Sequence, residues 1–164
     1  METSIPFHGT ISRALFLRAQ ALHVGYRRLA FLIFPAAFAI MMWAGASAIP
    51  ISVKVLATAI ACAFVPLMAF LQRRQWQRLF TRTPYLADPI RGDVSEWGLR
   101  VESSMGKSEV PWERFVKYKM NDDLVLLYQG PNIFNLVAGE FFTTADDWAK
   151  ARRIIVERGR AGRA

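Results

Sequence analysis

The feature that most constrains this chain is a long apolar block from Leu29 to Leu71, in which Lys54 is the only charged residue. A helix on the surface of a soluble protein needs a polar face, and this block provides none. No acidic residue occurs between Glu2 and Asp88. The block begins too far from the N-terminus and runs too long for a signal peptide. It therefore predicts membrane-spanning helices.

Pro50 divides the block into two segments, about 29–49 and about 51–71. At about 1.5 Å per helical residue, each segment covers the roughly 30 Å hydrocarbon core of a bilayer. Because very few residues join them, we expect an antiparallel transmembrane hairpin that extends into the cytoplasm to residue 83. Pro35 and Pro66 lie inside the two spans, where membrane helices tolerate proline, and each predicts a kink.

Basic residues flank the hairpin on both sides. Four arginines precede it and four follow it, whereas the tip carries only Lys54, which can extend to the interface. The positive-inside rule then places both termini in the cytoplasm. Five of these residues are the candidate site, with a role in topology or in binding anionic lipid headgroups: Arg27, Arg28, Arg73, Arg74 and Arg78.

The net charge of +8 does not by itself indicate nucleic-acid binding. Eight arginines flank the apolar spans, and six of the remaining cations lie between Lys150 and Arg163, including a basic tail at 160–164. No basic helix with interleaved aromatic residues is present in the sequence. We therefore expect the lipid bilayer, rather than a nucleic acid, to be the charged partner.

Residues 1–28 form an N-terminal segment with two parts. Pro6 and Gly9 favour an extended lead. From Ile11 to Arg28 the pattern is helical, and an apolar stripe recurs at spacings of three and four residues: Leu15, Ala19, Leu22 and Tyr26. We expect this helix to lie at the membrane surface or to continue directly into the first span.

Residues 84–159 are typical of a small soluble domain. After Pro84 the apolar period changes from that of a helix to that of strands. Strands are expected at 89–94, 99–103, 108–111, 115–120, 124–128 and 133–137, with Gly98 at a positive φ in a turn. Thr144 is a good N-cap for a final helix that ends at Gly159. The fold class is a membrane α-helical hairpin plus a small α+β domain, an antiparallel sheet capped by a C-terminal helix.

The sequence contains no residues that we assign to catalysis, to a cofactor or to a metal. His8 and His23 have no nearby carboxylate in the sequence, and the paired aspartates at 122–123 and 146–147 have turn and helix-start explanations. Cys62 is alone and lies in the second span, so it forms no internal disulfide. Trp112 and Trp148 are expected to anchor the core. We therefore predict a protein that is not an enzyme.

Several local motifs resemble the bacterial YcxB-like family. Glu96-Trp97-Gly98-Leu99 matches its glycine-containing turn, and the run from Val110 to Phe115 matches its proline–tryptophan corner. The family pattern then has a proline and a basic residue before a phenylalanine. Here the corresponding stretch, Leu136 to Phe142, lacks both. If relatives make a ligand contact with this segment, the resemblance does not carry that contact over to this chain.

The resemblance implies a two-span protein of the bacterial plasma (inner) membrane with a C-terminal domain like a pleckstrin-homology (PH) domain. It also implies that the extended lead could pair with the soluble sheet. Our leading hypothesis is a membrane-anchored, non-enzymatic interaction module that binds a protein partner or a second copy of itself. The alternatives are a sensor of anionic lipids and an accessory subunit of a larger membrane complex.

Overall fold

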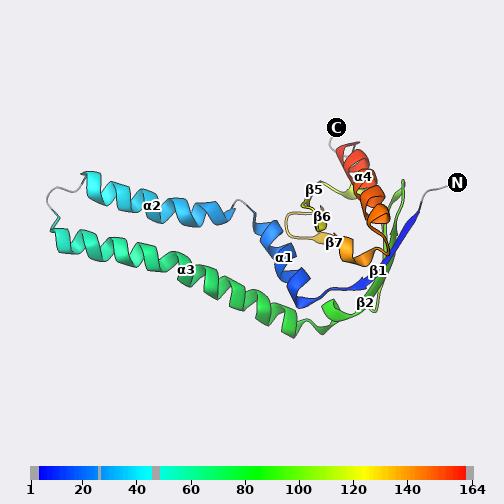
Figure 1. Cartoon of the computed structure of the whole chain (residues 1–164), viewed down its shortest axis with the longest axis horizontal. Coiled ribbons are helices and arrows are strands. Elements are labelled where there is room, and N and C mark those ends of the chain that lie inside the picture. Colours follow the sequence, from blue (N-terminus) through cyan, green and yellow to red (C-terminus); the bar gives the residue numbers. More distant parts are fainter. Residues whose placement is uncertain (1–3, 26, 46–48, 162–164) are drawn as a thin grey trace. The chain divides into compact units, whose positions relative to one another are not determined.

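The computed structural model describes residues 4–25, 27–45 and 49–161, and the side chains of residues 27–32, 34, 45, 160 and 161 lie outside this description. The chain divides into two units. Residues 1–23 and 80–164 form the globular unit, and residues 24–79 form the helical unit. Figure 1 traces both units along the chain.

The globular unit contains two antiparallel sheets. The first has the order β1-β2-β3-β4 and the second the order β5-β6-β7. The strands are β1 (Ile5–Thr10), β2 (Pro89–Val94), β3 (Gly98–Ser103), β4 (Gly106–Pro111), β5 (Lys117–Met120), β6 (Leu124–Tyr128) and β7 (Phe134–Ala138). The helix α4 (Ala145–Ala161) ends the described chain. This confirms the expected α+β class with antiparallel sheets and a C-terminal helix.

The extended lead is the first strand of the sheet. Strand β1 pairs with β2 in antiparallel register from Ile5↔Val94 to Thr10↔Pro89, as the family resemblance implied. Ile5 and Phe7 point into the core, whereas Pro6 and His8 are exposed. Gly92 permits the close packing, because a Cβ there would lie 2.1 Å from the Arg100 carbonyl oxygen and 2.6 Å from the Phe7 ring.

The first helix, α1 (Arg13–Val24), packs on the protein core. The predicted stripe is correct, but its environment is not the membrane surface: Leu15 and Ala19 are each 1% exposed. Phe16 is also buried, and its ring lies 5.5 Å from that of Phe80. Gly25 takes a φ of 50°, which ends α1 before the next helix, so the helix does not continue into the first span. Tyr26 lies outside the described residues.

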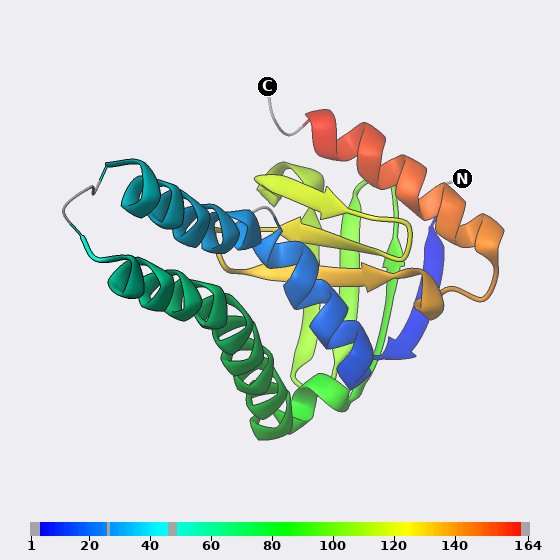
Figure 2. The same ribbon diagram turned by 60° about the vertical axis from the view of Figure 1, so that its left-hand side comes forward.

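The second sheet is covered on both faces. All five residues of β6 are fully buried. On the neighbouring β5, Lys119 reaches the last turn of α1, whereas Tyr118 packs against Gly159 of α4. Adjacent residues of a strand point to opposite faces, so α1 covers one face and α4 the other. Figure 2 shows the two helices on different sides of these strands.

Two predicted glycine roles are wrong, both for reasons of packing. Gly98 begins β3 and has no positive φ. Its missing side chain instead lets the paired strand approach, because a Cβ there would lie 2.3 Å from the Val110 carbonyl oxygen. Gly159 does not end α4, which continues to Ala161. Its missing side chain instead makes room for Tyr118, whose ring would lie 2.9 Å from a Cβ. Among the described residues, Gly25 and Gly106 have positive φ.

The start of α4 is capped as its sequence predicts. The Asp147 backbone N–H donates to Thr144 Oγ1 at 3.1 Å, and the Thr144 hydroxyl donates to the Asp147 carboxylate at 2.8 Å. These bonds satisfy a backbone donor that the first helical turn leaves without a partner. The helix follows the short 3₁₀ turn η3 (Gly139–Phe141), which comes directly after β7.

The helical unit contains α2 (Arg27–Gly45) and α3 (Ile51–Arg82) as far as Leu79, and the two helices lie side by side in Figures 1 and 2. Among the described residues, α3 alone is long and apolar enough to cross a membrane, and α2 contributes a shorter apolar stretch, Pro35–Ala44. One such helix is weak evidence of membrane association and does not confirm the two-span hairpin. Pro35 and Pro66 lie inside the two helices, and their kinks stay a prediction.

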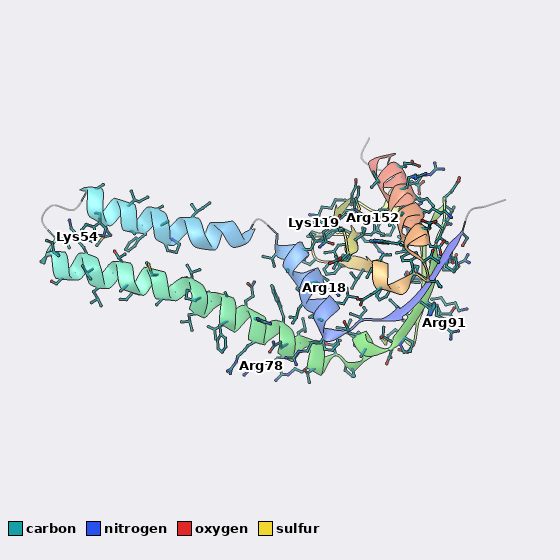
Figure 3. The ribbon with its side chains drawn as sticks, in the orientation of Figure 1. Arg18, Lys54, Arg78, Arg91, Lys119 and Arg152 are labelled. Atoms are coloured by element: carbon teal, nitrogen blue, oxygen red, sulfur yellow. The ribbon has the colours of Figure 1, made fainter. Side chains whose placement is uncertain are left out.

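Hydrogen bonds join α2 to α3 near the start of α3. The Trp43 indole N–H donates to Thr58 Oγ1 at 3.1 Å, and the Thr58 hydroxyl donates to the Lys54 carbonyl at 2.9 Å. The Lys54 side chain is buried, and its Nζ lies 5.8 Å from the centre of the Trp43 ring. Lys54 (labelled in Figure 3) therefore packs within the pair of helices.

Candidate functional site: the basic end of α3 and the support of α1

Three of the five candidate arginines lie exposed on the last third of α3: Arg73, Arg74 and Arg78. Figure 3 labels Arg78 on this helix. The Arg74 guanidinium lies 4.6 Å from the centre of the Phe70 ring, one helical turn earlier. Arg74 and Arg78 are four residues apart and therefore share a helix face. Arg27 and Arg28 begin α2, but their side chains lie outside the described residues, so the structure locates three of the five candidate side chains.

The arginines of the globular unit differ from those of α3 in their ion pairs. Arg18 pairs with Asp123 at 3.4 Å and with Glu140 at 3.1 Å, and Arg158 pairs with Glu96 at 3.1 Å. Within the described part of the chain, Arg73, Arg74 and Arg78 form no such pair with a carboxylate. No acidic residue occurs near them in the chain either, since none lies between Glu2 and Asp88. Their charge is therefore available to anions outside the chain.

Beneath the end of α1 lies an aromatic cluster that the sequence did not predict. Tyr128 is fully buried, and its hydroxyl oxygen lies 2.9 Å from His23 Nδ1. The His23 ring stacks on Phe134, with ring centroids 5.2 Å apart. Burial raises the pKa of Tyr128, so its hydroxyl stays protonated at neutral pH. The cluster is a support for the helix rather than a source of base chemistry.

Lys119 fixes the last turn of α1. Its Nζ donates to the carbonyl oxygens of Leu22 and His23. The carbonyls of the last helical turn have no partner within the helix, and a cation there also complements the helix dipole. On the same strand, Lys117 Nζ lies 4.9 Å from the centre of the Tyr128 ring. The end of α1 that leads to the helical unit is thereby held on the second sheet.

This cluster carried no local sequence signal. His23 and Tyr128 are 105 residues apart in the chain. The periodicity of α1 placed His23 near its apolar stripe, and β6 was recognisable as an apolar strand. Neither pattern indicates which residue of a distant element lies opposite. Only a prediction of the contact between α1 and the second sheet would have found the pair.

The other residues singled out in the sequence have structural roles. Trp112 is buried, and its indole N–H donates to the Ser95 carbonyl at 3.0 Å, which confirms it as a core anchor. Trp148 is half-buried, lies 5.4 Å from the Phe142 ring and donates to the Asp122 carbonyl. The Asp122 carboxylate pairs with Arg152 at 3.6 Å. These contacts close the unit where α4 begins.

Comparison with protein families identifies one part of the chain. Residues 94–155 match the family model described as YcxB-like protein, which confirms the resemblance found in the sequence. The matched segment runs from the last residue of β2 into α4, so it contains β3 to β7. Strand β1, helix α1 and the helical unit lie outside it. No curated protein and no solved structure matched the chain.

Proposed function

We propose that the chain is a membrane-anchored, non-enzymatic interaction module that presents a small PH-like domain in the bacterial cytoplasm. The observation that carries this proposal is the exposed apolar surface of α3. Ile60, Leu67 and Phe70 are all more than half exposed on this helix. Contiguous apolar surface of this kind is covered by lipid or by another protein, whereas the globular unit already has a packed core of its own.

A second span in α2 is supported by its length and surface. The helix has 19 residues, which at about 1.5 Å per residue is close to the roughly 30 Å hydrocarbon core. Its described side chains include exposed Ile40 and Met41. The pairing of Trp43 with Thr58 ties α2 to α3. Together the two helices make the multi-pass hairpin anchor of the inner membrane that the sequence predicts.

The PH-like assignment is supported by the topology of the globular unit. Sheets of four and three antiparallel strands are followed by a C-terminal helix, which is the arrangement that the resemblance implies. Because the core is filled by the unit's own side chains, we propose that partners bind at its surface. The partner is another membrane protein or a second copy of the chain.

Crosslinking of the full chain in native membranes, followed by mass spectrometry, tests the interaction. The exposed Lys107 gives the reagent access to the globular unit. We expect reproducible crosslinks to one protein, or between two copies. The matched control is Phe7→Ala, which removes a core side chain and leaves the anchor unchanged. Crosslinks made by the folded globular unit should be weaker in this variant, and if none forms in the parent, the interaction module is refuted.

The orientation of the anchor has a separate test. We expect a reporter fused to the C-terminus to be active only in the cytoplasm, because both flanks of the hairpin carry arginines and the tip carries one lysine. Activity on the outer side of the membrane would contradict the orientation without affecting the fold of the globular unit.

Binding of anionic lipids is a second candidate function. It is favoured because Arg73, Arg74 and Arg78 form no ion pair with a carboxylate in the described part of the chain. Basic residues at an anionic membrane surface each contribute about 1 kcal/mol, so the three together would favour anionic over zwitterionic lipid by up to about 3 kcal/mol, or roughly a hundredfold. Like charges four residues apart repel in an isolated helix, and anionic headgroups would relieve that repulsion.

Native mass spectrometry of the full chain in mixed-lipid nanodiscs measures this preference directly. We expect Arg73→Gln, Arg74→Gln and Arg78→Gln together to abolish most of the selectivity, and added salt to weaken it in the parent. Arg100→Gln is the matched control, because Arg100 is also exposed but pairs with Glu109 at 2.7 Å. If the triple variant and Arg100→Gln had equal lipid selectivity, the α3 arginines would be excluded as the lipid site.

A further inference from the structure

An exposed row of three residues, two of them apolar, lies at one end of the second sheet. The Val116 N–H donates to the Tyr128 carbonyl, and the Gln129 N–H donates to the Ile133 carbonyl. Together with the pairs Lys117↔Tyr128 and Tyr128↔Phe134, these bonds place Val116, Gln129 and Ile133 side by side across three chain segments. Val116 is 56% exposed and Ile133 is 67% exposed. We call these three residues the end row.

The end row follows directly on the part of the second sheet that contacts the last turn of α1. Tyr128 and Phe134, which immediately flank it on β6 and β7, both contact the His23 ring. The first segment of the globular unit ends at this turn with His23, and the helical unit begins at Val24. His23 precedes the apolar block, which begins at Leu29, by so few residues that even an extended chain spans at most roughly 20 Å between them.

The charges around the end row suit an anionic surface. The turn from Gln129 to Ile133 contains no charged residue. Lys117 is exposed beside it, and its stem lies over the Tyr128 ring. Glu113 and Arg114 precede the row, and their charges cancel. A net positive charge next to exposed apolar side chains is the composition that binds at the headgroup boundary of a bilayer.

We propose that the end row inserts into the headgroup region of the membrane that holds the anchor, with Lys117 at the anionic phosphates. This inference rests on the proposed membrane anchoring. It explains why two large aliphatic side chains are exposed at the sheet end where the chain leaves for the apolar block. It also makes α1 and its Lys119 and His23 contacts the link that fixes the globular unit against the bilayer.

Fluorescence of a dye attached to residue 133 tests the insertion. Cys62→Ala removes the natural cysteine, and Ile133→Cys then provides one labelling site for the environment-sensitive dye NBD in the purified full chain. The protein is reconstituted into vesicles of phosphatidylcholine and phosphatidylglycerol. The matched control is Trp97→Cys in the same background, because Trp97 is also a large exposed apolar residue, 49% exposed, on the turn between β2 and β3.

We expect the dye at residue 133 to emit at shorter wavelength than the dye at residue 97. It should lose quenching by aqueous iodide and gain quenching by lipids that carry a shallow spin label. Replacing Lys117 with Glu should reverse part of this shift. Because the sample contains no other protein, contact with a partner cannot produce the signal, and dilution of the protein in lipid excludes contact between copies.

The outcomes separate this inference from the proposed anchoring. If the chain floats with the vesicles while the dye at residue 133 is quenched by iodide as strongly as the dye at residue 97, the insertion is refuted and the anchor stands. If the chain does not float with the vesicles after carbonate extraction, the anchoring itself fails. A blue shift that disappears on dilution in lipid indicates contact between copies and also overturns the insertion.

Discussion

Removal of the Phe7 side chain tests whether the N-terminal strand belongs to the core of a domain whose other strands begin some eighty residues later. Phe7 is 3% exposed, and its ring lies 5.6 Å from that of Phe142 and 6.3 Å from that of Phe141. A buried phenylalanine replaced by alanine costs about 3–5 kcal/mol. A domain has about 5–15 kcal/mol of stability in total, so Phe7→Ala should bring the globular unit close to unfolding.

Hydrogen exchange of the full chain in nanodiscs measures this cost where it matters. The amides of β6 (Leu124–Tyr128) belong to a fully buried strand, so they exchange mainly through global opening of the unit. A loss of 3–5 kcal/mol corresponds to a roughly 10²- to 10³-fold faster exchange, because about 1.4 kcal/mol is a factor of ten. The amides of α3 should be unaffected.

His8→Ala is the matched control. His8 neighbours Phe7 on β1 but points to the exposed face, and exposed substitutions change stability by about 0.5 kcal/mol or less. If Phe7→Ala and His8→Ala accelerated exchange in β6 equally, β1 would not be part of the core. A fragment that begins at Pro84 would lack β1 and α1 altogether, so every test here uses the full chain.

Two further substitutions probe the packing. Gly92→Ala places a Cβ 2.1 Å from the Arg100 carbonyl oxygen in the paired strand, so it should lower the stability of the unit by at least about 1–3 kcal/mol, measured by thermal unfolding, and a parent-like Tm would contradict the register of β2 and β3. Tyr128→Phe removes the hydrogen bond to His23 and should cost about 1 kcal/mol. Burial raises the pKa of Tyr128 in the folded chain, so the unfolded chain loses the tyrosine proton first as the pH rises above about 10. The free energy of unfolding therefore falls with rising pH in that range. This alkaline loss of stability should be smaller in Tyr128→Phe, and an unchanged pH profile would argue against the burial.

Local chemistry explains most of the elements that could be predicted. The alternation and turn residues of the soluble half gave β2 and β6 with the same bounds as the structure. The cap at Thr144 gave the start of α4. The prediction that a strand begins at Phe115 was two residues early, because the 3₁₀ turn η2 (Trp112–Arg114) ends with the Phe115 N–H donating to the Trp112 carbonyl.

Of the candidate site, the sequence predicted the arginines of α3 but not the contacts that hold the end of α1 on the second sheet. The arginines of α3 are exposed, and the neighbouring chain has no acidic residue to pair with them, as their sequence context indicates. The contacts of Lys119 and Tyr128 with the end of α1 were not predictable, since they join segments about a hundred residues apart. The end row was missed for the same reason, because its three members come from separate segments.

The sequence by itself determined the apolar block, the asymmetry of its basic flanks and the periods of the helices and strands, because each of these is a property of neighbouring residues. The tertiary structure alone decided where the N-terminal segment belongs. An apolar helical stripe has the same spacing whether it faces lipid or protein, and only its contacts with the sheets show that α1 packs on the globular core. In the folded chain, a strand encoded before the apolar block, β1, also pairs with one encoded after it, β2.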